Sequence, residues 1–448
     1  MSFAKKRFCS SIVAFVLLIL PATPWQGHVR AMPPVERTVL ANGLVLLVSE
    51  QHSLPFATLE LLVDCGSRRD PPGEEGLAYL TAKSILAGTS ERNADAIDEE
   101  LDFMGAVLRA ACGRDYATLK LQILKKDLGR GLDLFFEILT KPSFPEEEIR
   151  HQVDRTLASI RSAEDNPGVV ARKAFRRALF GDNPYGHPVR GTERSLPRVT
   201  RDGLVRFYKS FYRPNDSILT VVGDVKAGEI RKAVLSRLTG WGKARIPETP
   251  FTPPLATEAK VVKIDRKIAQ ANIILGHGGV SRADPDFYAL RVMNYILGGG
   301  GFASRLMEEV RNKRGLAYSV ASFFDAWKYP GSFQISLQTK NSSAREAISL
   351  SLHEMERIRS EPVSEKELQG ARKYLTGSFP LRLDTQRKLA AFLTQAEYYG
   401  LGLDYASRYP SLIESVTSGE VLRVARTHLH PDRIVLVVVA DLKEAGME

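Results

Sequence analysis

Hydrophobic residues along the chain recur with two periods, and the period at each point predicts a strand or a helix. Residues 35–47 alternate around Asn42-Gly43, which predicts a β-hairpin with a tight turn. Apolar runs predict buried strands at 56–63 and 217–222, and 106–123 predicts a strand pair. Recurrence every three to four residues predicts helices over 76–86, 94–104, 127–139, 145–163, 169–179 and 200–211, with polar loops over 66–76 and 183–191.

The second half of the chain repeats this order. Segment 212–225 resembles 429–442, and FPEEEI at 144–149 resembles VSEKEL at 363–368. A strand over 56–63 followed by a helix matches a strand over 271–276 followed by a helix over 286–297. The sequence therefore predicts two copies of one α+β unit of about 200 residues. A Pro- and Gly-rich stretch separates them, which gives domains at 32–240 and 259–448 with a linker over 241–258.

The first 31 residues have the composition of an export signal. Basic residues at 5–7 precede an apolar run over 12–20 that is too short to span a bilayer, and Pro21 follows it. The segment carries four basic residues and no acid, so the net charge without it falls from +10 to +6. No dense patch of basic and aromatic residues follows, which argues against nucleic-acid binding. We expect a periplasmic or secreted protein with no stable membrane span after cleavage.

Two cysteines follow that segment, Cys65 and Cys112, each directly before a glycine. Two cysteines are too few for a disulfide framework. In an exported protein they form either one bridge or two free thiols, and the sequence leaves both alternatives open because it does not give their separation.

Four glycines open the segment over 298–319, and a helix is expected from about 303 to 313. Glycines ahead of a helix leave backbone N–H groups free at the positive end of the helix dipole. Arg311 lies near the end of this helix and Tyr318 at the start of the next strand, and both are hydrogen-bond donors that together can hold a carbonyl oxygen. The alternative is a purely structural helix end with a basic last turn and a glycine stop.

Several motifs give the chain a resemblance to the insulinase/pitrilysin metallopeptidases, among them the subunits of mitochondrial processing peptidase. They are Asn42-Gly43-Leu44, Cys65-Gly66-Ser67-Arg68, Gly76-Leu77-Ala78, Leu86-Ala87-Gly88-Thr89, Glu164-Asp165-Asn166-Pro167, Gly298–Gly301, Ser304-Arg305-Leu306, Val310-Arg311 and Arg314-Gly315-Leu316-Ala317-Tyr318-Ser319. The resemblance implies two homologous domains, each a mainly antiparallel sheet packed with helices, which form a clam-like half-shell.

Active members of that family carry His-x-x-Glu-His on the first helix and a glutamate on a later helix. The aligned residues here are Tyr79 to Lys83 and Ser159, so no zinc ligand and no general base stands at these positions. No other metal site is expected. His428 and His430 would lie on opposite faces of a strand, His353 has Glu356 nearby but no second histidine, and His52, His151, His187 and His277 are isolated.

In the same family an arginine and a tyrosine seven residues apart hold the substrate backbone, and Arg311 and Tyr318 have that spacing. The resemblance therefore implies a non-catalytic subunit, similar to the alpha subunit of mitochondrial processing peptidase. It would hold an extended peptide or unfolded protein with Arg311, Tyr318, Gly299 and Gly300. A homologous partner with His-x-x-Glu-His would supply zinc in a heterodimer, with no cofactor on this chain. Two alternatives stay open: an inactive homologue that is a peptide-binding or assembly scaffold, and a self-sufficient metallopeptidase.

Overall fold

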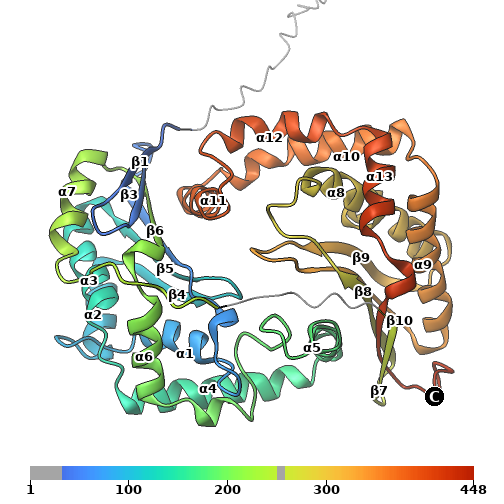
Figure 1. Cartoon of the computed structure of the whole chain (residues 1–448), viewed down its shortest axis with the longest axis horizontal. Helices are drawn as coiled ribbons and strands as arrows, with labels where there is room; N and C mark the ends of the chain where they lie inside the picture. Colours follow the sequence, from blue (N-terminus) through green and yellow to red (C-terminus); the bar gives the residue numbers. More distant parts are fainter. Residues whose placement is uncertain (1–32, 250–257) are drawn as a thin grey trace, which may run out of the picture. The chain divides into compact units, whose positions relative to one another are not determined.

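The computed structural model describes residues 33–249 and 258–448, and its first half is built on a six-stranded sheet (Figure 1). The strands follow the order β1-β2-β6-β3-β5-β4. β2 and β6 run parallel, and the other neighbours run antiparallel. The bounds are β1 Glu36–Val39, β2 Val45–Glu50, β3 Phe56–Val63, β4 Val107–Cys112, β5 Ala117–Leu124 and β6 Ser217–Gly223. The predicted hairpin, buried strands and strand pair are all confirmed.

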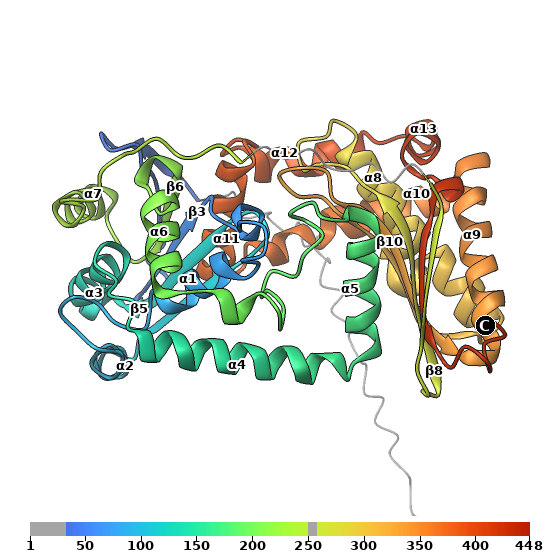
Figure 2. The same cartoon turned by 60° about the horizontal axis from the view of Figure 1, so that its bottom comes forward.

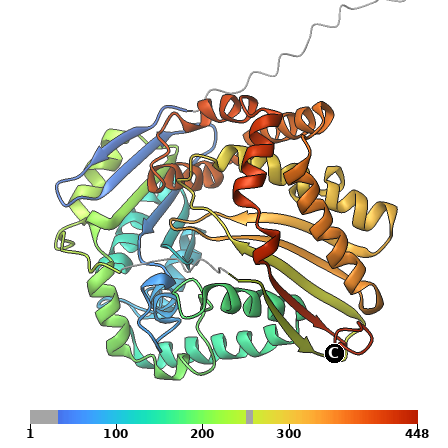
Figure 3. The same cartoon turned by 45° about the vertical axis from the view of Figure 1, so that its right-hand side comes forward.

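A five-stranded sheet forms the second half and repeats this topology. Its order is β7-β11-β8-β10-β9, with β7 and β11 parallel and the other neighbours antiparallel. The bounds are β7 Lys260–Asp265, β8 Gln270–Gly278, β9 Ala317–Asp325, β10 Ser332–Lys340 and β11 Val435–Ala440. Figure 3 shows β11, in dark red, beside the yellow strands of this sheet. These strands match β2, β6, β3, β5 and β4 in order and direction, so the predicted α+β fold of two like units is confirmed.

Several helices begin at a residue whose side chain caps the first turn. Asn93 accepts a hydrogen bond from the Ala96 N–H at the start of α2, and Ser364 with Glu367 forms a capping box on α10. The helices are α1 Leu77–Ser84, α2 Ala94–Met104, α3 Leu128–Thr140, α4 Glu146–Glu164, α5 Pro167–Phe180, α6 Arg201–Phe211, α7 Ala227–Arg237, α8 Phe287–Asn294, α9 Ala344–Ser360, α10 Glu365–Gly377, α11 Gln386–Tyr398, α12 Tyr405–Glu414 and α13 Ser418–His428. Within the described ranges no helix combines the length and apolarity needed to cross a membrane.

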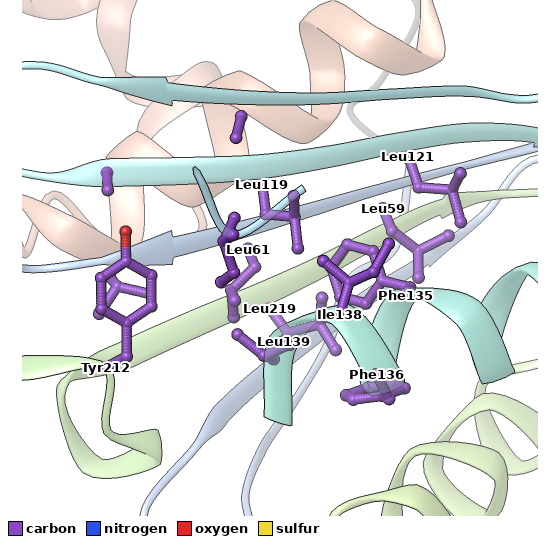
Figure 4. Packing of buried hydrophobic residues seen from close by; sticks show 14 of the residues in the cluster. Leu59, Leu61, Leu119, Leu121, Phe135, Phe136, Ile138, Leu139, Tyr212 and Leu219 are labelled. Carbon is purple, nitrogen blue, oxygen red and sulfur yellow. The ribbon is translucent and has the colours of Figure 1, made fainter. Parts of the chain in front are cut away.

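The core of the first half lies between its sheet and α3 (Figure 4). Leu59 and Leu61 of β3 point to one face of the sheet because side chains alternate along a strand, and both are fully buried. Phe135 and Ile138 of α3 pack over them, three residues apart on one helical face. Each such side chain contributes roughly 1.5–3 kcal/mol by leaving water.

Each half also covers the sheet of the other half with one helix. Phe175 and Leu179 of α5 pack on Val437 and other residues of β8 and β11, in the second sheet. In return, Leu389 and Leu393 of α11 pack on β6 and β3, in the first sheet. Figure 2 shows α5 standing beside the strands of the second half. Residues 33–240 and 259–448 thus exchange helices, and the described chain forms one compact unit.

The start of the predicted polar loop over 66–76 is buried. Arg68 is 2% exposed because Asp64, at the end of β3, accepts a hydrogen bond from its guanidinium at 2.7 Å. Asp64 also accepts bonds from Lys328 Nζ at 2.6 Å and from the Tyr398 hydroxyl at 2.7 Å. Lys328 follows β9 and Tyr398 ends α11. This Asp64 network therefore joins the two halves.

Three other expectations concern the two cysteines, the export signal and the linker. Cys65 and Cys112 are both free, and burial raises the pKa of the Cys65 thiol, which keeps it protonated. The predicted export signal lies outside the described residues. The predicted linker is described only at its two ends, over 241–249 and at residue 258, where it carries no helix or strand.

Candidate functional site

Arg311 and Tyr318 lie together, as their positions in the sequence predicted. Arg311 stands on a π-helix, Met307–Lys313, and Tyr318 stands at the start of β9. The guanidinium carbon lies 5.7 Å from the centroid of the Tyr318 ring, and the ring is 74% exposed. Arg311 has no carboxylate partner among the residues with described positions. Its Nη1 contacts only the Met307 sulfur, a weak acceptor, at 3.9 Å, so the guanidinium can still bind an oxygen of another molecule.

A third side chain completes this arrangement and was missed by sequence reasoning. The Arg311 guanidinium lies 5.0 Å from the ring of Phe302, which is 70% exposed. The sequence feature that could have indicated it is the position of Phe302, an apolar ring directly after the four glycines at 298–301. Two rings beside one guanidinium make a cation–π sandwich that holds the charge at the surface. The site thus offers charged donors, a phenol and an exposed apolar ring.

The backbone fixes this geometry on both sides of Arg311. The Gly315 N–H donates to the Arg311 carbonyl at 2.8 Å, and the Leu316 N–H donates to the Val310 carbonyl at 2.9 Å. Just before the π-helix, buried Arg305 forms an ion pair with Glu367 of α10 at 2.6 Å. Burial opposes ionisation of Glu367, but hydrogen bonds from Arg305 and Ser364 outweigh it and lower the pKa of Glu367 to about 2. The segment is therefore anchored independently of any ligand.

The glycines have a different role from the predicted one. Gly298 and Gly299 end a π-helix, Tyr295–Gly299, and the Gly300 N–H donates to the Tyr295 carbonyl at 2.9 Å. The expectation that these glycines precede the helix with free N–H groups is wrong for Gly300. A Cβ on Gly298 would lie 2.6 Å from the backbone nitrogen of Ser322 in β9. Gly298 therefore allows the helix to approach the strand that carries Tyr318.

The positions aligned with zinc ligands also lie together. Tyr79 and Lys83 stand one turn apart on α1, and Lys83 Nζ lies 5.9 Å from the Tyr79 ring. Arg190 donates to the Ser159 hydroxyl at 2.9 Å and stacks 5.9 Å from the same Tyr79 ring. This basic cluster, Tyr79, Lys83, Ser159 and Arg190, brings a phenol, a hydroxyl and two cations to one place.

Zinc does not fit the basic cluster. Zinc ligands in proteins are thiolates, imidazoles and carboxylates, and the cluster contains none of them. Burial lowers the pKa of Lys83, and the charge of Arg190 lowers it further, because the two cations repel each other. Lys83 Nζ is held by the carbonyl of Ala110 in β4 at 2.7 Å. The cluster is a structural brace between α1, β4 and α4.

One other group in the described chain has the proximity of metal ligands: Asp284, Asp286 and His428. Arg423 binds both carboxylate oxygens of Asp286, at 2.6 and 3.0 Å. This contact, and then the His428 bond, lowers the pKa of Asp286 to about 2. The Asp286 carboxylate is therefore already engaged by Arg423 and His428.

Three expectations about histidines are wrong. His52 is not isolated, because its ring nitrogens lie 2.6 Å from Asp224 and 3.3 Å from Glu50. His428 ends α13 and His430 precedes β11, so the two do not share a strand. The expected opposite faces were also wrong in principle, because residues two apart on a strand lie on the same face. His277 is not isolated, since its Nε2 accepts the His430 N–H at 3.1 Å. It is 1% exposed, and burial lowers its pKa to about 4.

The fold defines a protein of two like α+β units, one of which carries the Arg311–Tyr318 pair. Residues 45–193 match the model of the insulinase family, peptidase family M16, and residues 198–375 match that of the peptidase M16 inactive domain. The chain belongs to the insulinase family.

Relatives extend over nearly the whole chain. A protein from Streptomyces coelicolor, named an uncharacterized zinc protease, is 30% identical over 92% of this chain and 90% of its own length. A probable mitochondrial-processing peptidase subunit beta from Arabidopsis thaliana is 25% identical over 95% of this chain and 82% of its own. The crystal structure of a peptidase M16 inactive domain from Pseudomonas fluorescens is 28% identical, with a TM-score of 0.85, and covers 91% of this chain and 98% of that one.

Proposed function

We propose that this chain is the non-catalytic, substrate-binding subunit of a heteromeric zinc peptidase, exported from the cytoplasm. It holds an extended peptide with Arg311 and Tyr318, and a homologous partner with His-x-x-Glu-His supplies the zinc. The observation that carries the proposal is the contrast between two places. Half-buried Arg311 and exposed Tyr318 lie side by side, whereas the zinc positions hold Tyr79, Lys83 and Ser159 beside Arg190.

The position of Tyr318 supports an extended peptide as the ligand. β9 is an edge strand of the second sheet, and both Tyr318 and Ser319 on it are exposed. An edge strand leaves backbone N–H and C=O groups free to pair with an added strand. A peptide on this edge would place a carbonyl within reach of Arg311. The guanidinium and the phenol would then donate to that oxygen, and Phe302 would cover an apolar side chain of the peptide.

These residues bind and orient, but they supply no nucleophile. Donors directed at a carbonyl stabilise negative charge that develops on its oxygen, which is worth a few kcal/mol, roughly 3–4, where water is excluded. The attacking water and the metal therefore belong to the partner. Zinc would polarise that water when bound there.

A second function is favoured by the same basic cluster. Because Lys83 and Arg190 are built into the contacts among α1, β4 and α4, the chain can be a peptide-binding or assembly scaffold with no protease partner. A pull-down from the native envelope distinguishes the two, since only the first function predicts a His-x-x-Glu-His partner. Metal analysis of the pure chain tests the third alternative, a self-sufficient peptidase, which requires stoichiometric zinc.

The main test is reconstitution with a homologous His-x-x-Glu-His subunit. The chain alone should be inert, and the complex should cleave peptides. Arg311→Ala should lower kcat/KM of the complex by about a hundredfold with partner affinity unchanged. Arg314→Ala is the matched control, because Arg314 is exposed, lies three residues on and pairs with Glu346. Normal turnover by the Arg311→Ala complex would contradict the proposal.

A further inference from the structure

A cavity of about 570 Å³ lies in the second half, between α8, β9 and α10. Its volume is in the range of small-molecule sites. The cavity wall contains three arginines, Arg282, Arg291 and Arg382, and no aspartate or glutamate. Rings contributed by α8, the π-helix after it, β9 and α10 form much of the remaining wall. The cavity is separate from the Arg311 guanidinium, although Gly299 forms part of its wall.

The three guanidiniums have no carboxylate partner in the described parts of the chain. Arg282 donates to the Tyr405 hydroxyl at 2.9 Å and stacks 3.8 Å from the Phe287 ring, so aromatic groups hold it in place. The Nε of Arg291 is buried and has no hydrogen-bond partner among these residues. Other arginines of the second half, such as Arg305 and Arg423, form ion pairs with an acid. The cavity instead brings together three arginines whose charges no described carboxylate balances.

The cations also repel each other. Loss of hydration and then the charge of Arg291 lower the pKa of Arg382. Arg382 lines the cavity and is also exposed, so it stands where the cavity meets solvent. An anion that enters would relieve this repulsion and satisfy the Arg291 Nε. Guanidinium groups bind carboxylates and phosphates with two parallel N–H bonds.

The aromatic wall limits what accompanies the anionic group. Phe287, Phe323 and Tyr295 offer ring surface to the cavity, and rings prefer flat or apolar partners. We propose that this cavity binds a small organic anion, in which a phosphate or carboxylate meets Arg291 and Arg382 and a flat apolar body meets the rings. This site goes beyond the proposed peptide-holding function and does not depend on a partner subunit.

Calorimetry and thermal unfolding of the full chain test the proposal, with phenyl phosphate, benzoate and inorganic phosphate as probes at low ionic strength. Phenyl phosphate or benzoate should bind and raise the melting temperature, and binding of neither would overturn the proposal. Comparison of the affinities of phenyl phosphate and benzoate shows whether the cavity prefers a phosphate or a carboxylate group. Inorganic phosphate should bind more weakly than phenyl phosphate. Equal affinity would overturn the proposal that the rings bind an apolar body.

Variants locate the binding site. Arg291→Met and Arg382→Met should each weaken binding by about tenfold. Arg382→Met should also melt at a higher temperature than the parent chain without ligand, because it removes the repulsion. A purely structural arginine would give the opposite shift. The control Arg314→Met, outside the cavity, should change neither value. Unchanged affinity in the Arg291→Met and Arg382→Met variants would refute the site.

Discussion

Asp64→Asn should destabilise the protein more than any surface ion-pair substitution, because Asp64 joins its two halves. Its side chain is 7% exposed and accepts bonds from Arg68, Lys328 and Tyr398 at 2.6–2.7 Å. Burial alone would raise the pKa of Asp64, but the charges of Arg68 and Lys328 outweigh it and lower the pKa. The ionised form is therefore the native one.

The expected magnitude follows from what the substitution leaves behind. Asparagine keeps the size of the side chain but removes its charge. Arg68, whose side chain is 3% exposed, would then have only Asp115 at 3.7 Å. Breaking a buried pair in this way costs about 3–5 kcal/mol, because the remaining charge stays desolvated. The exposed pair Lys388–Asp384 is the comparison, since Asp384→Asn should cost at most about 1 kcal/mol.

Urea unfolding followed by circular dichroism and tryptophan fluorescence measures both variants. Trp327 packs against Tyr185 at 4.8 Å next to Lys328, and Trp241 lies in the core of the first half, so emission reports on both parts. A double-mutant cycle with Lys328→Met should give a coupling energy of about 1–3 kcal/mol. A cost for Asp64→Asn no larger than that of Asp384→Asn would refute the reasoning.

Three further predictions test the core, the protonation state and the basic cluster. Gly298→Ala should cost about 1–3 kcal/mol in urea unfolding because its Cβ meets β9, whereas Gly370→Ala, in open space on α10, should stabilise by about 0.5–1 kcal/mol. The folded-state pKa of His277 is about 4 against about 6.5 unfolded, so the unfolded chain binds the proton first. Stability should therefore fall by up to about 3 kcal/mol as the pH drops from 6.5 to 4, with a smaller slope in His277→Gln. The third change restores the zinc ligands with Tyr79→His, Ala82→Glu, Lys83→His and Ser159→Glu. Metal analysis should find one zinc per chain only when Arg190→Gln is added, because the Arg190 charge repels the ion. Equal zinc content with Arg190 retained would contradict this role of Arg190.

The strands of the first half and most of its helices could be predicted because each depends on a local pattern. The strand predicted over 56–63 has the same bounds as β3, and the helix predicted over 94–104 has the same bounds as α2. The repeat was also visible, since the turn and strand around 217–223 recur at 435–440. Helix α7 was not predicted, because its apolar residues form only a weak stripe. Helices α9, α11 and α12 and strands β7 and β10 were not predicted either.

Partners distant in sequence could not be predicted. The apolar face of α5 indicates that the helix is buried, but a sheet of either half can cover it. The loop over 66–76 is polar in composition, yet residues 66–70 are buried beside Asp64, with which Lys328 and Tyr398 pair from 264 and 334 residues away. Arg282, Arg291 and Arg382 have no regular spacing in the sequence that would predict their meeting around one cavity. Burial of polar groups depends on such long-range partners, which no local pattern contains.

The glycine segment, 298–319, shows how local sequence pattern and long-range contacts combine. Its sequence identified Arg311 and Tyr318 correctly as neighbours, since a helix, a turn and a strand return the chain on itself. The assumed reason, free N–H groups at a helix start, does not hold for Gly300. The segment is glycine-rich because Gly298 must pass within contact of Ser322 on β9. That close approach sets Arg311 between Phe302 and Tyr318 on an edge strand, which is where an extended peptide would add. Gly298 therefore shapes the proposed binding site by packing, and the Gly300 N–H is used within the chain rather than for a ligand.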